Sequence, residues 1–486
     1  MSCKKPQKVI KEAIFATKEQ IQKSFSSHHN RSMQLRKQPI ADRKKLLRRF
    51  SDFILSNRER IGNAVHNDFK KPLLEVDLSE IYPVLSELRH AIEKLDQWTA
   101  PQKIDAPLTY LGTRSKIVFE PKGVCLIIAP WNYPFSLCLG PLVSCLAAGN
   151  TAIIKPSELT PHTARLIAEL VREFFEEDLV TVFEGGQDVS TELLRLPFDH
   201  IFFTGSPAVG KVVMKAAAEN LSSVTLELGG KSPTIIDKTA RIADAAKRIA
   251  FGKFLNNGQT CIAPDYVLIH SEVKDKFVEA LKKEVILLFG EDNKIDEASS
   301  NYSRIVNHRH FGRLSSLIED AIAGGAKIEM GGTVNEQTNF IHPLILTNVS
   351  ASSRMMEEEI FGPVLPIISY ETDTEVIDIV NSKPKPLALY VFSHDCKSRN
   401  RVLAATSAGS VCINECVIQF THANLPFGGV NNSGIGKSHG YYGFLEFSNQ
   451  KPVLHQMSRF SSIGFLYPPF QSKLKAFIVK LMLKYF

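Results

Sequence analysis

The chain lacks the features that would place it in a membrane or outside the cell. No stretch reaches the roughly 18 consecutive apolar residues of a membrane-spanning helix, and the mean hydropathy is −0.06. Eight cysteines in 486 residues form no dense framework, and four of them lie in apolar runs. We therefore predict reduced thiols and a cytoplasmic protein. The N-terminal residues contain no uninterrupted apolar segment, so we expect no secretory signal.

Acidic residues are scarce at one end of the chain and absent from the other. Residues 1–50 hold fourteen Lys and Arg against three acids, and residues 451–486 hold six against none, while the remainder has a net charge of −10. A basic charge confined to the ends excludes a nucleic-acid-binding body. It indicates that the two ends contact a membrane surface or a partner. The alternative is that the basic residues lie on solvated helix faces.

The rest of the composition is ordinary for a globular protein, and the length suffices for about three structural units. Apolar residues recur at helical spacing through residues 7–100. From residue 116, short β-rich runs ended by Pro or Gly alternate with helices, and this pattern restarts after Gly229 and Gly230. The alternation predicts an α/β fold with two doubly wound parallel sheets and a hinge at the double glycine.

The strongest chemical feature is Cys261, which follows the polar residues NNGQT and precedes a strand. A thiol in such a loop, flanked by free backbone amides, can be held partly as thiolate and attack a carbonyl carbon. A buried structural cysteine is the alternative, and we favour it for Cys138 and Cys145. The polar approach to Cys261 favours a nucleophile.

Two further polar residues stand at the ends of apolar strands. Glu227 lies in VTLELGGKSP, where loss of solvation would raise its pKa toward that of a general base. Asn132 lies in APWNYPF, between prolines, and its amide can donate to a developing oxyanion. Taken alone, each has a plainer interpretation: an exposed strand-end glutamate and a turn asparagine.

A glycine-containing turn follows the strand HIFFTG and opens a helix. Gly205 and Gly210 would let the backbone approach a pyrophosphate at the helix N-terminus, although the spacing is not GxGxxG. Glu359, before an Ile-Phe-Gly-Pro turn, could bind ribose hydroxyls. The segment GIGKSHG at 434–440 resembles the end of a P-loop. The glycine that a P-loop needs five residues before Gly436 is replaced by Asn431, which argues against an ATPase. We expect His308 and His310 on the surface.

Together these segments resemble the aldehyde dehydrogenase superfamily, from about residue 30 to 455. The Tyr in PWNYP and the YPP near the end resemble the class 3 branch, which includes fatty aldehyde dehydrogenases. The motifs stand in the family's order: PWNYP at 130–134, IIKPSE at 153–158, FTGS at 203–206, LELGGKSP at 226–233, GQTC at 258–261, EIFGP at 359–363 and PFGGVNNSGIGKSHG at 426–440.

The resemblance implies Cys261 as nucleophile, Glu227 as general base and Asn132 as an oxyanion donor beside the Cys261 amide. It implies NAD as the cofactor, with NADP as an alternative, and no metal. The residues that it assigns to the cofactor are Lys155 and Glu158 at the adenosine ribose, Gly205, Ser206 and Gly210 at the pyrophosphate, and Glu359 and Phe361 toward the nicotinamide ribose.

The activity implied is oxidation of a medium- or long-chain aliphatic or aromatic aldehyde to its carboxylic acid. A CoA-acylating dehydrogenase and a non-catalytic binding protein with the same fold remain alternatives. We expect a homodimer that binds no nucleic acid. Four units are predicted: a cofactor-binding domain at 1–228, interrupted by an arm segment near 101–120; a catalytic domain at 229–420; an oligomerisation arm at 421–455; and a tail at 456–486.

The tail combines an apolar stripe with basic residues. Six apolar residues at three and four spacing predict an amphipathic helix, with charge supplied by lysines and no acid. Such a helix is too short to span a bilayer but suits a peripheral contact of residues 470–486 with an anionic interface. Capping of the partner subunit or covering of the substrate entrance is the alternative. The apolar residues are Leu474, Phe477, Ile478, Leu481, Met482 and Tyr485.

Overall fold

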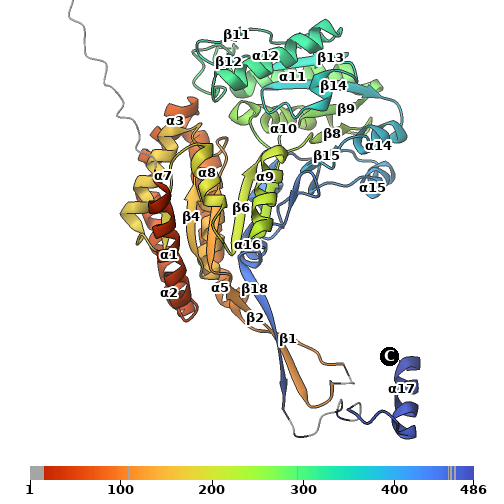
Figure 1. Cartoon of the computed structure of the whole chain (residues 1–486). Coiled ribbons are helices and arrows are strands. Elements are labelled where there is room, and N and C mark those ends of the chain that lie inside the picture. Colours follow the sequence, from red (N-terminus) through yellow and green to blue (C-terminus); the bar gives the residue numbers. More distant parts are fainter. Residues whose placement is uncertain are drawn as a thin grey trace, which may run out of the picture.

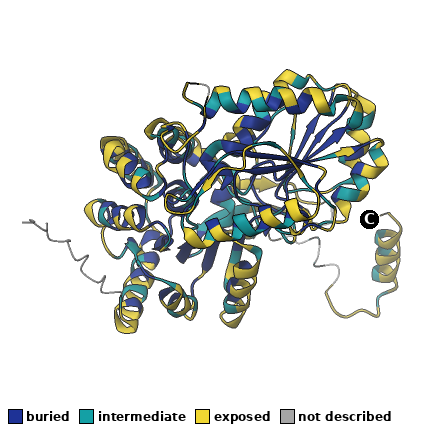
Figure 2. Ribbon diagram, turned by 90° about the horizontal axis from the view of Figure 1, so that it is seen from above, coloured by how far each residue is buried: buried dark blue, intermediate teal, exposed yellow. Residues whose placement is uncertain are grey.

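The computed structural model describes residues 16–107, 110–292, 294–457, 459, 462, 464 and 467–485. Two α/β units lie side by side, and a long antiparallel ribbon projects from them (Figure 1). A terminal helix lies near the far end of this ribbon, away from both units (Figures 1 and 2).

The first unit is built on a six-stranded sheet. Its strands β3 and β4 are buried along their whole length, as expected for a parallel sheet covered on both faces. Only β17, at one edge, runs antiparallel to its neighbour. The strand order is β17 (Gly434–Ile435), β7 (Ser223–Leu228), β6 (His200–Gly205), β3 (Val124–Ile128), β4 (Thr151–Lys155) and β5 (Val180–Val182).

Helices cover both faces of this sheet and form two separate apolar cores. One face carries α2 (Ile40–Ser56), α3 (Arg58–Phe69), α5 (Tyr82–Thr99), α6 (Ser136–Ala148) and α7 (Pro161–Phe174). The other carries α1 (Lys18–Leu35), α8 (Gln187–Leu194) and α9 (Pro207–Glu219). Between α3 and α5 lie α4 (Leu73–Val76) and a π-helical turn over Asp77–Ile81.

The second unit is built on a seven-stranded sheet, whose edge strand β10 runs antiparallel to β13 while the other pairs are parallel. Its order is β10 (Lys327–Met330), β13 (Leu344–Thr347), β14 (Val364–Tyr370), β9 (Tyr266–His270), β8 (Pro233–Ile236), β15 (Ala388–Phe392) and β16 (Ser410–Ile413). Between β10 and β13, the chain forms a small hairpin of β11 (Val334–Asn335) and β12 (Phe340–Ile341).

Helices again pack on both faces, which confirms the predicted pair of doubly wound α/β units. In Figure 2 the buried sheet of this unit lies between helices whose outer faces are exposed. One face carries α10 (Ile242–Phe254) and α11 (Lys274–Phe289). The other carries α12 (His308–Ala323), α13 (Arg354–Glu357), α14 (Asp373–Asn381) and α15 (Cys396–Ala405).

The projecting arm is a three-stranded antiparallel sheet of β1 (Gln102–Ile104), β2 (Thr113–Pro121) and β18 (Ser448–Gln456). Within the segment 421–455, only β18 belongs to this sheet. β17 instead extends the first sheet, and α16 (Gly440–Glu446) packs on α5 and α6. The chain between β17 and α16 therefore lies against the end of β7.

The terminal helix α17 (Lys473–Tyr485) has no buried residue. Lys475 Nζ donates to the carbonyl of Pro469 at 3.2 Å, which ties the helix to the turn before it. Among the described residues, no helix combines the length and the apolar character that crossing a membrane requires.

Candidate active site

A left-handed turn presents Cys261. Asn256 and Asn257 have φ of 52° and 57°, a region that asparagine tolerates better than most residues. A Cβ at Gly258 would lie 2.3 Å from the carbonyl oxygen of Gly362, so the turn packs too closely for a side chain there. The residues NNG therefore form the bend, and the partly exposed Cys261 follows it.

Glu227 lies at the end of β7 and is 6% exposed. Its Oε1 accepts a hydrogen bond from the Ser438 hydroxyl at 2.9 Å, while its Oε2 is buried with no hydrogen-bond partner. Burial raises the pKa of Glu227 to about 8, although Ser438, His439 and Lys437 favour its ionised form. Only the ionised fraction of such a carboxyl can accept a proton, and this fraction grows as the pH rises through about 8.

Asn132 lies in the loop after β3 and is 3% exposed. Its Nδ2 donates to the backbone carbonyl of Gln259 at 3.0 Å, which leaves one amide hydrogen for another acceptor. Asn132, Glu227 and Cys261 all line one cavity of about 220 Å³ between the two units. The structure thus brings together the three residues that the sequence singled out for catalysis.

The same cavity reaches the first turn of α9. Gly205 ends β6, and Ser206 caps α9 by accepting from the Val209 N–H at 3.4 Å; both line the cavity. Free N–H groups at a helix N-terminus suit a phosphate. Gly210 does not line it. A Cβ at Gly210 would lie 2.7 Å from the Leu228 side chain, so this glycine serves close packing of α9 on β7.

Glu359 and Phe361 line the cavity from the second unit. Glu359 packs on the hinge, because a Cβ at Gly229 would lie 2.2 Å from its Oε2, and it accepts from the Gly230 N–H. Burial, and secondly the nearby Asp265, raise the pKa of Glu359 to about 8. The double glycine therefore allows a carboxyl to approach the backbone at the domain boundary.

Lys155 and Glu158 lie at the carboxyl end of β4, outside the lining of this cavity. Lys155 Nζ lies 2.5 Å from Glu158 Oε2. The lysine is buried, whereas the glutamate is half exposed. The pair therefore presents a carboxylate at the surface.

The surroundings of Cys261 favour its neutral thiol. Burial, followed by the carboxyls of Glu359 and Glu227, raises the pKa of Cys261 to about 12, and the backbone N–H groups of Cys261 and Ile262 only partly oppose this. The sequence had suggested a partly ionised thiol. The difference arises mainly because the thiol is buried, and secondly because two carboxyl groups share the cavity with it.

A smaller cavity of about 60 Å³ adjoins Cys261 and Glu227 on another side. Apart from its polar end, its walls are mostly apolar or aromatic, including Val84, Leu137, Leu387, Phe420 and Phe427. The polar end includes His439 and Glu87, whose Nδ1 and Oε1 lie 2.8 Å apart. Burial opposes protonation of His439, but Glu87 outweighs it and raises the histidine's pKa.

Several residues at the site were not identified from the sequence. Ser438 and His439 lie in the GIGKSHG segment, which belongs to one of the family motifs but was given no site residue; their position depends on the pairing of β17 with β7. His310 was expected on the surface but is only partly exposed: its ring centroid lies 4.8 Å from that of Trp131, with the ring planes tilted by 49°, and it lines the larger cavity. Burial lowers the pKa of His310 to about 4. His308 is exposed as expected.

This combination, a cysteine, a carboxyl and an amide donor converging between two doubly wound units, defines a class of enzymes that attack carbonyl groups through a thiol. The chain belongs to the aldehyde dehydrogenase family, whose model matches residues 2–453. It is an oxidoreductase that acts on aldehydes.

Relatives with assigned names extend over almost the whole chain. It is 44% identical to 4,4'-diaponeurosporen-aldehyde dehydrogenase of Staphylococcus aureus, over 90% of this chain and 94% of that protein. It is 42% identical to aldehyde dehydrogenase family 3 member A2 of Rattus norvegicus, over 93% of this chain and 90% of that protein. The family 3 name of the second relative agrees with the class 3 resemblance.

Solved structures agree with the fold. Substrate-bound AldH of Staphylococcus aureus superposes with a TM-score of 0.90 at 42% identity, covering 95% of this chain and 99% of that one. Betaine aldehyde dehydrogenase of Staphylococcus aureus, in complex with NAD+, superposes with a TM-score of 0.82 at 30% identity, covering 92% and 89%.

Proposed function

We propose that the protein oxidises an apolar aldehyde to the carboxylic acid with NAD(P)+, through a thiohemiacetal and a thioester on Cys261. The observation that carries this proposal is the convergence of Cys261, Glu227 and Asn132 on one cavity that also reaches the N-terminus of α9. The test is reduction of NAD+ or NADP+ on addition of an aldehyde, with the acid as product and no CoA present.

The first step is addition of the Cys261 Sγ to the carbonyl carbon. The carbonyl oxygen gains negative charge, and the free amide hydrogen of Asn132 together with the backbone N–H of Cys261 can stabilise it. Because the thiol's pKa is raised, its proton must leave as the bond forms. This proton can pass to solvent or to the free Oε2 of Glu227, which must lose it again before it acts on water.

The residues around the larger cavity fit a dinucleotide. Gly205 leaves the end of β6 free of a side chain beside the N–H groups of α9, and the carboxyl of Glu359 lies against the hinge glycines. Gly205 and Ser206 would hold the pyrophosphate, and Glu359 with Phe361 the nicotinamide ribose. When bound, the nicotinamide supplies a hydride acceptor, which permits oxidation of the adduct on Cys261 to a thioester.

Hydrolysis of the thioester completes the reaction. Glu227 takes a proton from water, and the hydroxide equivalent attacks the acyl carbon and releases Cys261. A CoA-acylating enzyme would instead transfer the acyl group to a second thiol. The buried base with a pKa of about 8 favours the acid-forming reaction. Dependence of turnover on added CoA would favour the alternative.

The substrate proposed is a medium- or long-chain aliphatic or an aromatic aldehyde. The smaller cavity beside Cys261 is lined mostly by apolar and aromatic side chains, which favour an apolar chain. A relative is named for 4,4'-diaponeurosporen-al, and its name supports the same class. A panel of aldehydes of rising chain length should show kcat/KM increasing with chain length.

For the cofactor, we propose a preference for NAD over NADP. The exposed carboxylate of Glu158 could bind a ribose 2′-hydroxyl and would repel a 2′-phosphate, while Lys155, already paired with Glu158, softens that repulsion. Steady-state KM values for the two dinucleotides test this preference directly.

We further propose that the chain forms a homodimer. Within the described residues β16 is the last strand of its sheet, and its Val411 and Ile413 are 42% and 44% exposed. Open apolar strand edges recruit other chains. The arm also projects away from the two α/β units (Figure 1). We therefore assign a second copy of this chain as the partner that covers the edge of β16 and the arm. Analytical ultracentrifugation tests the assignment.

Residues 470–486 are proposed to contact anionic membranes peripherally. On α17, Leu474, Phe477 and Leu481 are at least 41% exposed. Lysines at 473, 475, 480 and 484 supply charge complementary to acidic lipid headgroups. The helix is therefore available to lie in an interface rather than to pack on its own domains.

A further inference from the structure

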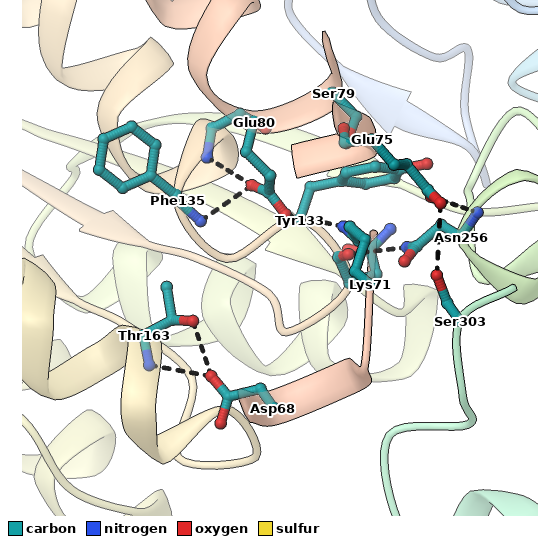
Figure 3. Close-up of polar contacts among 12 residues, drawn as sticks. Asp68, Lys71, Glu75, Ser79, Glu80, Tyr133, Phe135, Thr163, Asn256 and Ser303 are labelled. Atoms are coloured by element: carbon teal, nitrogen blue, oxygen red, sulfur yellow. Dashed lines mark hydrogen bonds and ion pairs between the residues drawn. The ribbon is translucent and has the colours of Figure 1, made fainter. Parts of the chain in front are cut away.

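A group of buried and half-buried ionisable side chains lies between α3 and α5, and the proposed chemistry does not use it. Lys71 and Glu80 have no exposed side-chain surface and form an ion pair of 2.9 Å between Nζ and Oε1. Glu75 lies between them in the chain, and burial raises its pKa. Figure 3 shows all three on one short segment. That segment includes the π-helical turn, a rare structure that occurs often at functional sites.

Glu80 holds the loop that carries Asn132. Its Oε2 accepts from the backbone N–H of Phe135 and of the following residue, at 3.1 and 3.0 Å. These N–H groups lie at the start of α6, where no acceptor within the helix is available. Lys71 Nζ lies 4.4 Å from the ring centroid of Tyr133, next to Asn132 in the chain. The ion pair therefore contacts this loop at two points.

Glu75 holds the turn that precedes Cys261. Its Oε1 accepts from the Asn256 N–H at 2.8 Å, and its Oε2 accepts from the Ser303 hydroxyl at 3.4 Å (Figure 3). Asn256 has a φ of 52°, a left-handed conformation that most residues avoid and asparagine tolerates. The bond from its N–H to the carboxyl of Glu75 stabilises that conformation further.

Asn256 links the two loops. Its Nδ2 donates to the carbonyl of Asn132 at 2.8 Å and to that of Gln259 at 3.2 Å. A continuous path of hydrogen bonds therefore runs from Glu75 through Asn256 to Asn132. None of the three ionisable side chains is among the residues that line the two cavities, so they can act on the reaction only through these loops.

We propose that Lys71, Glu75 and Glu80 are positioning residues that fix the Asn132 side-chain amide relative to the Cys261 thiol. The proposal rests on the proposed function, because it requires that this amide binds the oxygen of the adduct. The two loops belong to different units, and apolar packing alone would let them slide. Hydrogen bonds to backbone N–H groups set both distance and angle. A misplacement of about 1 Å at a reacting centre reduces rates roughly 10²-fold.

The test compares Glu75→Ala with Glu75→Gln. Alanine removes the acceptor for the Asn256 N–H, whereas glutamine keeps an acceptor oxygen and can donate to Ser303. Asp237→Ala is the matched control: Asp237 is buried and, like Glu75, accepts a backbone N–H, from Thr239 at 2.6 Å, but at the opposite end of β8 from the double glycine. All variants are assayed well below their melting temperatures, in the intact chain.

We expect Glu75→Ala to slow the pre-steady-state burst of NAD(P)H roughly 10-fold to 10²-fold, with the KM for NAD+ within about twofold of wild type. Glu75→Gln should restore most of the burst rate. Asp237→Ala should lower the melting temperature without slowing the burst.

The proposal is overturned if Glu75→Ala keeps the wild-type burst rate, or if Asp237→Ala slows the burst as much as Glu75→Ala at equal loss of stability. If Glu75→Ala does not fold, the proposal is tested by Glu80→Gln, which puts an amide donor against Lys71. An unchanged burst rate in Glu80→Gln would also overturn the proposal. Failure of the proposed function is distinguishable, because the wild-type enzyme would then show no aldehyde-dependent NAD(P)H at all.

Discussion

The hydroxyl of Ser438 donates to Glu227 Oε1 at 2.9 Å and so joins the chain after β17 to the end of β7. A carboxyl works as a base only when ionised, and burial holds the pKa of Glu227, the proposed base, at about 8. The deacylation rate should therefore be low at pH 6 and rise as the pH increases through about 8. Because the Ser438 hydroxyl stabilises the carboxylate, it keeps this pKa lower than burial alone would set it.

Ser438→Ala should consequently move the rising limb of the kcat profile to higher pH, by about one unit. The loss of the donor destabilises the ionised form, so the variant is expected to recover near-normal kcat at sufficiently alkaline pH. The measurement is kcat against pH for both enzymes with one saturating aldehyde. A profile that keeps its midpoint but loses amplitude at every pH would show that Ser438 does not tune Glu227.

Cys261→Ala should abolish turnover, by roughly 10⁴-fold or more, because no covalent adduct can form. Dinucleotide affinity, measured by quenching of protein fluorescence, should stay within about twofold, since the α9 N-terminus is untouched. Cys396→Ala, at an exposed position, is the matched control and should keep full activity. Retention of a tenth of wild-type turnover by Cys261→Ala would refute the nucleophile assignment.

Glu227→Gln should impair hydrolysis more than acylation. We expect a burst of about one NADH per active site, followed by turnover slowed roughly 10²-fold to 10⁴-fold. Rapid-quench or stopped-flow measurement separates the two phases. Equal loss of burst and steady state would mean that Glu227 acts earlier, in removal of the thiol proton, which the raised pKa of Cys261 makes a real alternative.

The positions of the candidate catalytic residues could be predicted from sequence because each belongs to a short motif whose local structure determines its place. Asn132 follows a strand, Glu227 ends one, and Cys261 follows a left-handed turn that asparagine and glycine favour. Their convergence follows from the carboxyl ends of parallel strands meeting a loop of the neighbouring unit. The presence of two doubly wound units followed from the alternation of strands and helices, whereas the strand order within each sheet comes from the structure.

Other features depend on contacts between distant segments, which no local pattern encodes. Ser438 reaches Glu227 only because two residues of β17 pair with β7. His310 contacts Trp131 of the other unit, a contact that the local sequence NHRH cannot show. That local sequence alone therefore predicts an exposed residue. Glu75 contacts Asn256 across 181 positions of the chain. Such partners become visible only when the fold is assembled.

The last prediction concerns α17. Lysines near an anionic surface contribute about 1 kcal/mol each, and exposed apolar side chains add to this, so the helix could hold the enzyme at a membrane without spanning it. Deleting residues 470–486 should weaken co-sedimentation with vesicles rich in phosphatidylserine at low salt. Turnover of a short aldehyde should hardly change.

Two substitutions separate the contributions of charge and apolar contact. Lys480→Glu with Lys484→Glu should weaken binding to anionic vesicles and abolish its salt dependence, because screening acts on charge. Phe477→Ser should weaken binding at all salt concentrations. Vesicles of phosphatidylcholine alone are the control and should bind the wild-type chain poorly. Vesicle binding that survives the deletion would refute the membrane contact, whereas loss of dimerisation or a changed chain-length preference would instead show that α17 caps the partner subunit.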